Sequence, residues 1–320
     1  MARIFGLCCV ILCLMAGCAE RTAYRYLDMA RDYEQRGDGE PALMAYRAAV
    51  EACPGDVYLR RVLGRAYLRR RMYAEAAGEL EQVLQAEPGY VEAYLDMAAI
   101  LEAQHMPEAA IGWLERAVQT VPDYLPANRD LVEFYLSREQ PDEALALLER
   151  MAKRWPETAW VHYSLGQLYL QLNLNDRAET AFRSAVGADG EFAQAYASLG
   201  NALYEQKKYG AAVEAYQAAI SLNPRDHSSL NNLAWVYAVQ GSRLQEGIEI
   251  SSRALQLAPD SPIYLDTLAE LYYRQGDSER AVTLIRRAMA LYALHPEDPE
   301  LKAHLQHQLK KFTAAGSGKV

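Results

Sequence analysis

Apolar residues recur along this chain at three- and four-residue spacing, in short stretches separated by turn-forming residues. Within residues 91–124 two such groups follow one another: Tyr94, Met97, Ala98 and Leu101, and then Ala110, Leu114, Ala117 and Val118. This spacing places the apolar side chains on one face of an α-helix. Pro107 lies where the second helix should begin, because a missing N–H costs least there, and Pro122 lies where it should end. The stretch therefore predicts two short antiparallel helices, neither of which can bury its apolar face alone.

This two-helix pattern returns with a period of 34 residues, and the alternation typical of strands is absent. Eight units follow one another: 23–56, 57–90, 91–124, 125–158, 159–192, 193–226, 227–261 and 262–295. The seventh unit needs one extra residue, near Gly241–Ser242. A constant period indicates a stack in which each unit contacts its neighbours and the core is one continuous seam.

The residue types within each unit resemble those of the tetratricopeptide repeat (TPR) family, whose signature is Trp-x2-Leu-Gly-x2-Tyr, then Ala-x3-Phe, then Pro. In the second unit the matching residues are Leu63, Gly64, Tyr67, Ala76, Leu80 and Pro88. The resemblance covers residues 23–295 and implies an all-α fold, a right-handed α-solenoid of eight TPR helical hairpins. Residues 296–312 carry a further apolar stripe and are predicted to form a C-terminal capping helix, followed by a flexible tail at 313–320.

Small residues explain how the two helices of a hairpin approach each other. Gly or Ala occupies the eighth position of every unit except the fourth, which has Val132, and Ala occupies the twentieth of every unit except the seventh, which has Gly247 when its extra residue is allowed for. Positions four, seven, eleven and twenty-four mostly carry larger residues that fill the seam. A bulky residue in place of Gly64 or Gly166 should overpack the seam at a cost of about 1–3 kcal/mol.

The N-terminus has the features of a secretion signal. Arg3 precedes an apolar run, Ile4–Met15, that is too short to span a bilayer comfortably. The run ends in Leu14-Met15-Ala16-Gly17-Cys18, which resembles the lipobox of bacterial lipoproteins, although the family prefers Leu to Met15. An ordinary cleaved signal peptide and an uncleaved anchor are the alternatives.

The lipobox resemblance implies that residues 1–17 form a signal peptide and that Cys18 is acylated, for example with palmitate. Residues 18–22 would then be a short lipidated linker. Ala19 after the cysteine implies sorting to the outer membrane, with the body facing the periplasm. The lipid would be the protein's only contact with the bilayer.

The net charge argues against a nucleic-acid partner, and the placement of the cysteines argues against a metal site. The formal net charge is -9, which argues against nucleic acid as a partner because phosphate binding needs a basic surface. Four of the five cysteines lie in the first eighteen residues without a neighbouring His or carboxylate, so they do not indicate a metal site.

Motifs for catalysis are absent or incomplete. Gly316-Ser317-Gly318-Lys319 lacks the other features of a phosphate-binding loop, and His304-x-x-His307 has no third metal ligand nearby. No Ser-His-Asp or Cys-His arrangement stands out. We therefore predict no catalytic residue, cofactor, metal or small-molecule substrate.

The resemblance places a binding groove along the first helices of the hairpins, at positions two, five, nine, twelve and thirteen. The predicted groove residues are Arg61, Arg65, Arg129, Trp160, Tyr163, Asn201, Tyr204, Asn231, Trp235 and Tyr273. Arginine binds carboxylates bidentately and aromatic residues anchor side chains, so this set suits an extended peptide that carries carboxylates. The alternative is that the tyrosines only pack and the arginines are only solvated.

The sequence thus predicts a non-catalytic scaffold of the bacterial envelope that binds a protein or peptide partner. Its role would lie in assembling an envelope machine, such as a pilus or secretion system, a polysaccharide exporter or a cell-wall complex. Two alternatives stay open. An enzyme subunit would need a buried cluster of ionisable groups with shifted pKa values. A cytoplasmic co-chaperone would need an unprocessed N-terminus.

Overall fold

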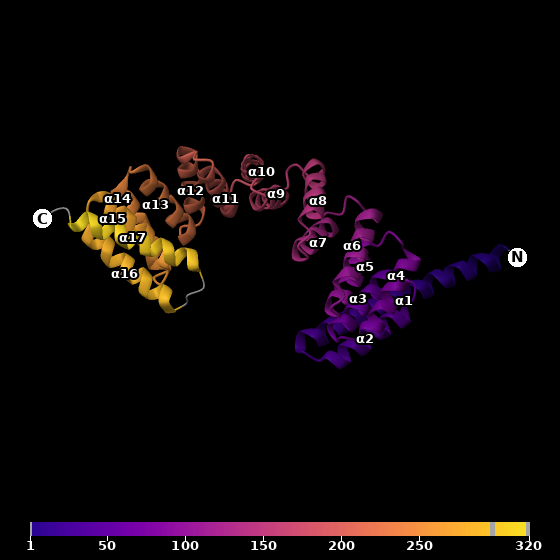
Figure 1. The fold of residues 1–320 in the computed structure, drawn as a ribbon. Helices are drawn as coiled ribbons and strands as arrows, with labels where there is room; N and C mark the ends of the chain where they lie inside the picture. The colour runs from indigo at the N-terminus through magenta and orange to yellow at the C-terminus, as the bar shows by residue number, and fades with distance from the viewer. Residues whose placement is uncertain (1, 295–297, 318–320) are drawn as a thin grey trace. The chain divides into compact units, whose positions relative to one another are not determined.

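The computed structural model describes residues 2–294 and 298–317, with side chains described within 19–293 and 298–314. The described residues form α-helices joined by short turns, and no strand occurs among them (Figure 1). The first helices of the hairpins are α1 Ala2–Arg36, α3 Val57–Arg69, α5 Val91–Ala103, α7 Leu125–Ser137, α9 Ala159–Gln171, α11 Ala193–Glu205, α13 His227–Gln240 and α15 Pro262–Gln275. The second helices are α2 Gly39–Ala52, α4 Tyr73–Ala86, α6 Pro107–Thr120, α8 Pro141–Arg154, α10 Asn175–Ala188, α12 Tyr209–Leu222, α14 Leu244–Leu257 and α16 Ser278–Leu294. A last helix, α17 Pro299–Ser317, follows.

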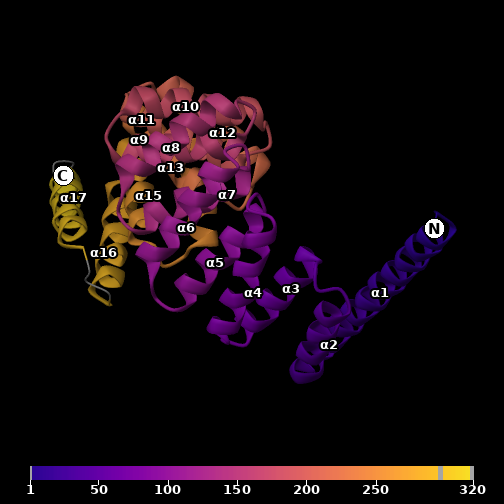
Figure 2. The same ribbon diagram turned by 90° about the vertical axis from the view of Figure 1, so that its right-hand side faces the viewer.

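The chain divides into two compact units, residues 1–147 and 148–320. In the first unit α3 packs on α4 and α4 packs on α5; in the second, α11, α12 and α13 repeat this order. Figures 1 and 2 show the same succession of helical pairs along each unit. The predicted all-α fold, a solenoid of TPR-type hairpins with a C-terminal capping helix, is confirmed.

In the hairpins that have glycine at the eighth position, the two helices approach closely there. A Cβ atom built on Gly166 would lie 2.5 Å from Cε1 of Phe182, and one built on Gly200 would lie 2.6 Å from Cε1 of Tyr216. Both aromatic residues are almost wholly buried. At Gly64 the contact is looser, because the nearest atom, Cγ of Leu80, would lie 3.2 Å away. Glycine thus leaves room for the large residue of the second helix.

One residue in the turn between the two helices of a hairpin has the same backbone conformation in all eight hairpins. The residue at position 15 of every hairpin has a positive φ angle: Gly37, Arg71, His105, Glu139, Asn173, Lys207, Gly241 and Gly276. At the second hairpin, the N–H of Arg71 donates to the Leu68 carbonyl and that of Met72 donates to the Tyr67 carbonyl. These are the two hydrogen bonds of a Schellman motif, which satisfies carbonyl groups at a helix end.

The seventh hairpin contains the extra residue predicted near Gly241–Ser242. There α13 ends at Gln240, Gly241 is left-handed, and Arg243 just before α14 is left-handed as well, with φ of 51°. The longer turn therefore uses two left-handed residues where the other hairpins use one.

The ends of the chain differ from the predicted segments. Helix α1 includes residues 18–22, which had been assigned to a linker, since no Gly or Pro interrupts residues 18–36. Helix α17 includes residues 313–317 of the predicted tail, because Thr313 and two alanines continue the helix. The Cys18 side chain lies outside the described residues, as do residues 318–320. Among the helices in the part that is described, none is both long and apolar enough to cross a membrane.

Candidate functional site

The first helices of neighbouring hairpins touch each other within each unit: α3 contacts α5, and α11 contacts α13. We call the surface formed by positions 2, 5, 9, 12 and 13 of these helices the first-helix face. Direct contact between neighbouring first helices is expected on the concave side of a stack of hairpins. The predicted residues on this face fall into an arginine set in residues 1–147 and an aromatic and amide set in residues 148–320.

Arg61 forms an ion pair within the chain. Its Nε donates to Oδ2 of Asp96 at 2.6 Å, and the two side chains are only 18% and 11% exposed. Burial raises the pKa of the Asp96 carboxyl, and the pairing with Arg61 opposes this only in part. Arg61 therefore already binds a carboxylate of its own chain. Arg65, whose Nε lies 3.7 Å from Oδ1 of Asp96, is half exposed and lies nearer to solvent.

Arg129 does not extend a basic surface from Arg61 and Arg65. Its Nε donates to Oε1 of Glu133 at 2.9 Å, one turn away on α7. Glu133 also lines a pocket of about 350 Å³ between α5 and α7, together with Glu102 and Asp130. Burial and the neighbouring Glu133 raise the pKa of Asp130. Carboxylates thus lie between Arg129 and the two arginines of α3, so the three arginines do not form a continuous basic surface.

Hydrogen bonds connect the aromatic and amide residues across α11, α12 and α13. Nε1 of Trp235 donates to the Tyr204 hydroxyl at 2.7 Å. Oδ1 of Asn201 accepts from the Tyr216 hydroxyl at 2.7 Å and from Nδ2 of Asn232 at 3.0 Å. Tyr204 and Trp235 are half-buried and Asn201 is exposed, so the network fixes partly exposed side chains in defined positions.

At α9 the predicted residues Trp160 and Tyr163 are both half-buried. The Tyr163 ring lies 4.8 Å from that of Phe192 and 5.9 Å from that of Phe182, and its hydroxyl accepts from Nε2 of Gln167. Tyr163 therefore packs against two aromatic rings and remains partly exposed, and its role in binding stays a prediction.

Two predicted groove residues are covered by the chain itself. Asn231 is 5% exposed, because it lies on the side of α13 that faces the core. Its Oδ1 is buried and has no hydrogen-bond partner among the described residues. The Tyr273 ring lies 4.7 Å from that of Phe312 and 4.8 Å from Nζ of Lys311, both on the capping helix. Neither residue presents an open binding surface.

The capping helix α17 contacts the first-helix face of the last hairpin through polar side-chain pairs that the sequence analysis did not predict. Nε2 of His304 lies 2.8 Å from Oδ2 of Asp266, and Nζ of Lys311 lies 2.6 Å from Oε2 of Glu270. Oε1 of Glu270 accepts from Nε of Arg274 at 2.6 Å. Burial raises the pKa of Asp266 despite the histidine.

This cluster of buried ionisable groups is the feature that a hidden enzyme site would need. However, α17 closes it: the Glu270 side chain is 2% exposed and pairs with Lys311, and Asp266 pairs with the His304 ring. Neither of these two carboxylates is among the residues predicted from the sequence. The available signal was their position, since Asp266 and Glu270 are four residues apart and so share the inward face of α15. No group of three metal-ligand side chains occurs among the described residues.

Two models described as tetratricopeptide repeat match this sequence. One matches residues 27–90 and 197–262, and the other matches 68–133, 101–154 and 135–203. The chain belongs to the tetratricopeptide repeat family. A model of anaphase-promoting complex, cyclosome, subunit 3 also matches residues 240–316 of this TPR protein.

Curated relatives match parts of the TPR chain. The mitochondrial import receptor subunit TOM70 of Rattus norvegicus is 26% identical over 129 residues, which cover 37% of this chain and 20% of TOM70. The Hsp70-Hsp90 organizing protein of Triticum aestivum is 25% identical over 136 residues, which cover 41% of this chain and 22% of that protein. The chain thus spans about a fifth of the length of these relatives.

Among solved structures, MamA from Desulfovibrio magneticus RS-1 is similar to this TPR chain, with a TM-score of 0.51 and 24% identity. The match covers 54% of this chain and 97% of that one, and it shows the fold alone. Solenoids of this kind present extended concave surfaces for binding. At this coarse level the chain is a protein-interaction module.

Proposed function

We propose that this TPR protein is a lipid-anchored, non-catalytic scaffold of the bacterial envelope that binds a protein or peptide partner on its first-helix face. The observation that carries the proposal is the hydrogen-bonded set on α11 and α13, in which Trp235 and Tyr204 are held together and stay partly exposed. Side chains that are fixed before binding lose little entropy when a partner docks, so they suit an interaction surface.

The chemistry of this face favours a polypeptide partner. Aromatic rings can hold apolar side chains, and the amides of Asn201 and Asn232 can exchange their mutual hydrogen bond for bonds to a peptide backbone. In the other unit, the half-exposed Arg65 offers a guanidinium group to a carboxylate of the partner. We propose that the partner belongs to an envelope machine, such as a pilus or secretion system, a polysaccharide exporter or a cell-wall complex.

The proposed anchor rests on the sequence Leu14-Met15-Ala16-Gly17-Cys18. It is tested by growing cells with an alkyne-labelled palmitate and isolating the protein. The native chain should carry the label and sediment with outer membranes, whereas Cys18→Ser should lose both properties. An unlabelled native protein would refute the lipid anchor without touching the binding face.

The proposed binding face is tested by affinity capture from crosslinked, detergent-solubilised envelopes. The variant Arg65→Glu with Trp235→Ala should lose a protein that the native chain captures. Arg61 is not a suitable choice, because a glutamate there would face Asp96. The matched control is Arg253→Glu, an exposed residue on the second helix α14, which should capture the same protein as the native chain.

Circular dichroism must first show that all forms have equal helix content and similar melting temperatures. Equal capture by the native chain and by the first-helix variant would mean that the partner docks on another surface. No specific capture by any form would contradict the scaffold function.

A further inference from the structure

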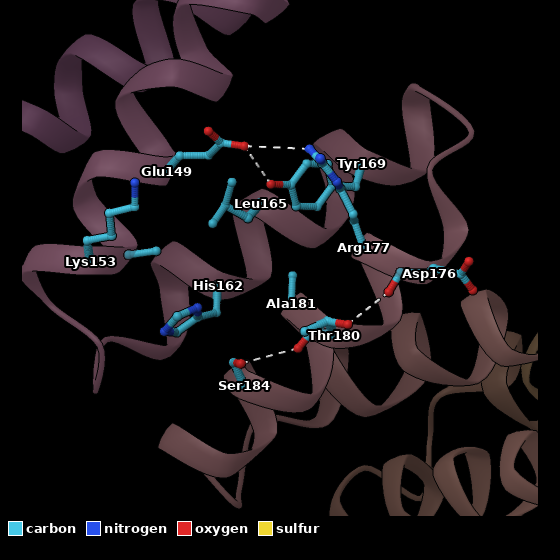
Figure 3. A pocket seen from close by; sticks show the side chains of 11 residues that line it. Glu149, Lys153, His162, Leu165, Tyr169, Asp176, Arg177, Thr180, Ala181 and Ser184 are labelled. Atoms are coloured by element: carbon cyan, nitrogen blue, oxygen red, sulfur yellow. Dashed lines mark hydrogen bonds and ion pairs between the residues drawn. The ribbon is translucent and has the colours of Figure 1, made fainter.

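A pocket of about 610 Å³ lies within residues 148–320, on the side of the second helices (Figure 3). The last turns of α8, the first helix α9 and the second helix α10 form its walls. Ala152, Leu165 and Ala181 contribute its apolar lining. This pocket is separate from the first-helix face, and the proposed function makes no use of it.

The pocket has a cause in the repeat sequence. Ala152 occupies position 28 of the fourth hairpin, a position at which the other seven hairpins all carry a larger apolar residue. These residues are Val50, Leu84, Val118, Val186, Ile220, Leu255 and Met289. A larger side chain at this position would fill space beside the following hairpin. Its absence at Ala152 leaves apolar surface uncovered between α8 and α10.

The polar groups around the pocket are mostly engaged within the chain. Oε1 of Glu149 accepts from the Tyr169 hydroxyl at 2.8 Å and lies 3.9 Å from Nη1 of Arg177. The Thr180 hydroxyl donates to the Asp176 carbonyl, and Nε2 of His162 donates to the Pro156 carbonyl at 2.7 Å. Figure 3 shows the Glu149, Tyr169 and Arg177 contacts along one edge of the pocket.

Lys153 differs from these groups. It is exposed at the rim and has no ion pair with any residue that the structure describes. A small polar ligand would need several convergent hydrogen-bonding groups. This pocket instead offers an apolar lining and, beside Ala152, the unpaired cation of Lys153, which complements an apolar group with a single negative charge beside it. The exposed Asp176 carboxylate points away from the apolar lining in Figure 3.

We propose that this pocket binds a large apolar side chain of a partner polypeptide, with Lys153 pairing with an adjacent carboxylate of the same polypeptide. A volume of about 610 Å³ lies in the usual range for binding pockets, about 300–1,000 Å³, and has room for a leucine or phenylalanine side chain with part of its backbone. The site would give the scaffold a second contact surface, on the opposite side of the hairpin from the first-helix face.

The test measures fluorescence anisotropy of labelled peptides added to the full-length protein in detergent. The probes are fluorescein-Gly-Ser-X-Asp-Gly, with X being Leu, Phe or Ser, and the same peptides with Asn in place of Asp. The Leu and Phe peptides should bind saturably, and the Ser peptide should bind at least tenfold more weakly. Replacing Asp by Asn should weaken binding to the native protein severalfold.

Two variants and one control locate the site. Ala152→Leu restores the residue size found in the other hairpins, so it should keep the fold and reduce binding at least tenfold. Lys153→Gln should bind the Asp and Asn peptides equally. Arg253→Glu, an exposed position of α14 outside both surfaces, should bind like the native protein. Absence of saturable binding by the Leu and Phe peptides, or unchanged binding by Ala152→Leu, would overturn the proposal, as would an equal loss of binding in Arg253→Glu.

Discussion

Position 15 of every hairpin is in the left-handed conformation, and in five of the eight hairpins the residue there is not glycine. For an L-residue this conformation costs about 1–2 kcal/mol. Asn173 tolerates it best, because asparagine visits this region more readily than other side chains. The Schellman hydrogen bonds of each turn hold the conformation in place.

At these turns, replacing glycine by alanine should therefore destabilise the protein, and replacing another residue by glycine should stabilise it. Gly37→Ala should destabilise the protein by about 1 kcal/mol, although no atom lies within 4 Å of the added methyl group, because the strain is in the backbone. His105→Gly should stabilise it by up to about 1 kcal/mol, since φ there is 61°. Urea denaturation midpoints test both; equal stability of Gly37→Ala and the native protein would contradict this account.

Tyr46 should make stability depend on alkaline pH. Burial and the hydrogen bond that its hydroxyl donates to Glu34 raise the pKa of Tyr46 from 10.0 to about 12. The folded state thus keeps the proton to higher pH than the unfolded state does. The stabilisation is complete below pH 10 and is lost as pH rises from 10 to about 12.

In Tyr46→Phe this part of the pH dependence should vanish. The difference in unfolding free energy between pH 10 and 12 should become smaller, by on the order of 1 kcal/mol. Denaturation curves recorded across this range for both proteins measure the difference. Parallel pH profiles would show that Tyr46 titrates normally.

At the scale of the helix pair, the effect of replacing a glycine on stability depends on how closely the neighbouring helix approaches it. Gly166→Ala should cost about 1–3 kcal/mol, because the added Cβ would lie 2.5 Å from the Phe182 ring. Gly112→Ala is the matched control: it lies within α6 with no neighbouring atom within 4 Å, so alanine should stabilise the helix by up to about 1 kcal/mol. Thermal melts that shift in the same direction for both variants would refute the packing argument.

Between neighbouring first helices, the Arg61–Asp96 pair connects α3 to α5. Asp96→Ala should cost about 3 kcal/mol, because it leaves the mostly buried Arg61 without its partner. The double variant Arg61→Met with Asp96→Leu should be more stable than Asp96→Ala, since it removes both charges. Chemical denaturation of the three proteins provides the comparison, and a neutral Asp96→Ala variant would show that the pair contributes little.

The sequence predicted the elements well because their determinants are local and repeated. Helix α3 begins at Val57 and α5 at Val91, the first residues of two predicted units, and Pro107 opens α6 as expected. Apolar spacing and turn residues recur with each period, so every unit supports the assignment of the others. The left-handed residues at position 15 were not predicted, since Arg71 or Lys207 gives no glycine signal.

The binding surface was harder to predict, because it depends on contacts between units. Arg61 and Asp96 are 35 residues apart, and neither residue type reveals that the two pair. Asn231 occupies one of the groove positions in the sequence, but its side chain on α13 is buried. A signal for the second-helix pocket was present, since Ala152 differs from seven larger residues at the same position, but it emerges only when the units are compared position by position.

At the scale of the whole molecule, the two units carry different surfaces. Residues 1–147 hold the arginine and carboxylate part of the first-helix face, and residues 148–320 hold the aromatic and amide part, the second-helix pocket and the capping helix. In the last hairpin α17 covers Asp266, Glu270 and Tyr273. A partner of the second unit therefore has the faces of α9, α11 and α13 available.

The most direct measurement is site-specific photo-crosslinking in cells. A benzophenone amino acid replaces Arg65 or Trp235 on the first-helix face, or Gln82 or Arg253 on exposed positions of second helices. The account predicts an adduct with one envelope protein from Trp235, from Arg65 or from both, and no such adduct from Gln82 or Arg253. Adducts formed only from Gln82 and Arg253 would contradict binding on the first-helix face.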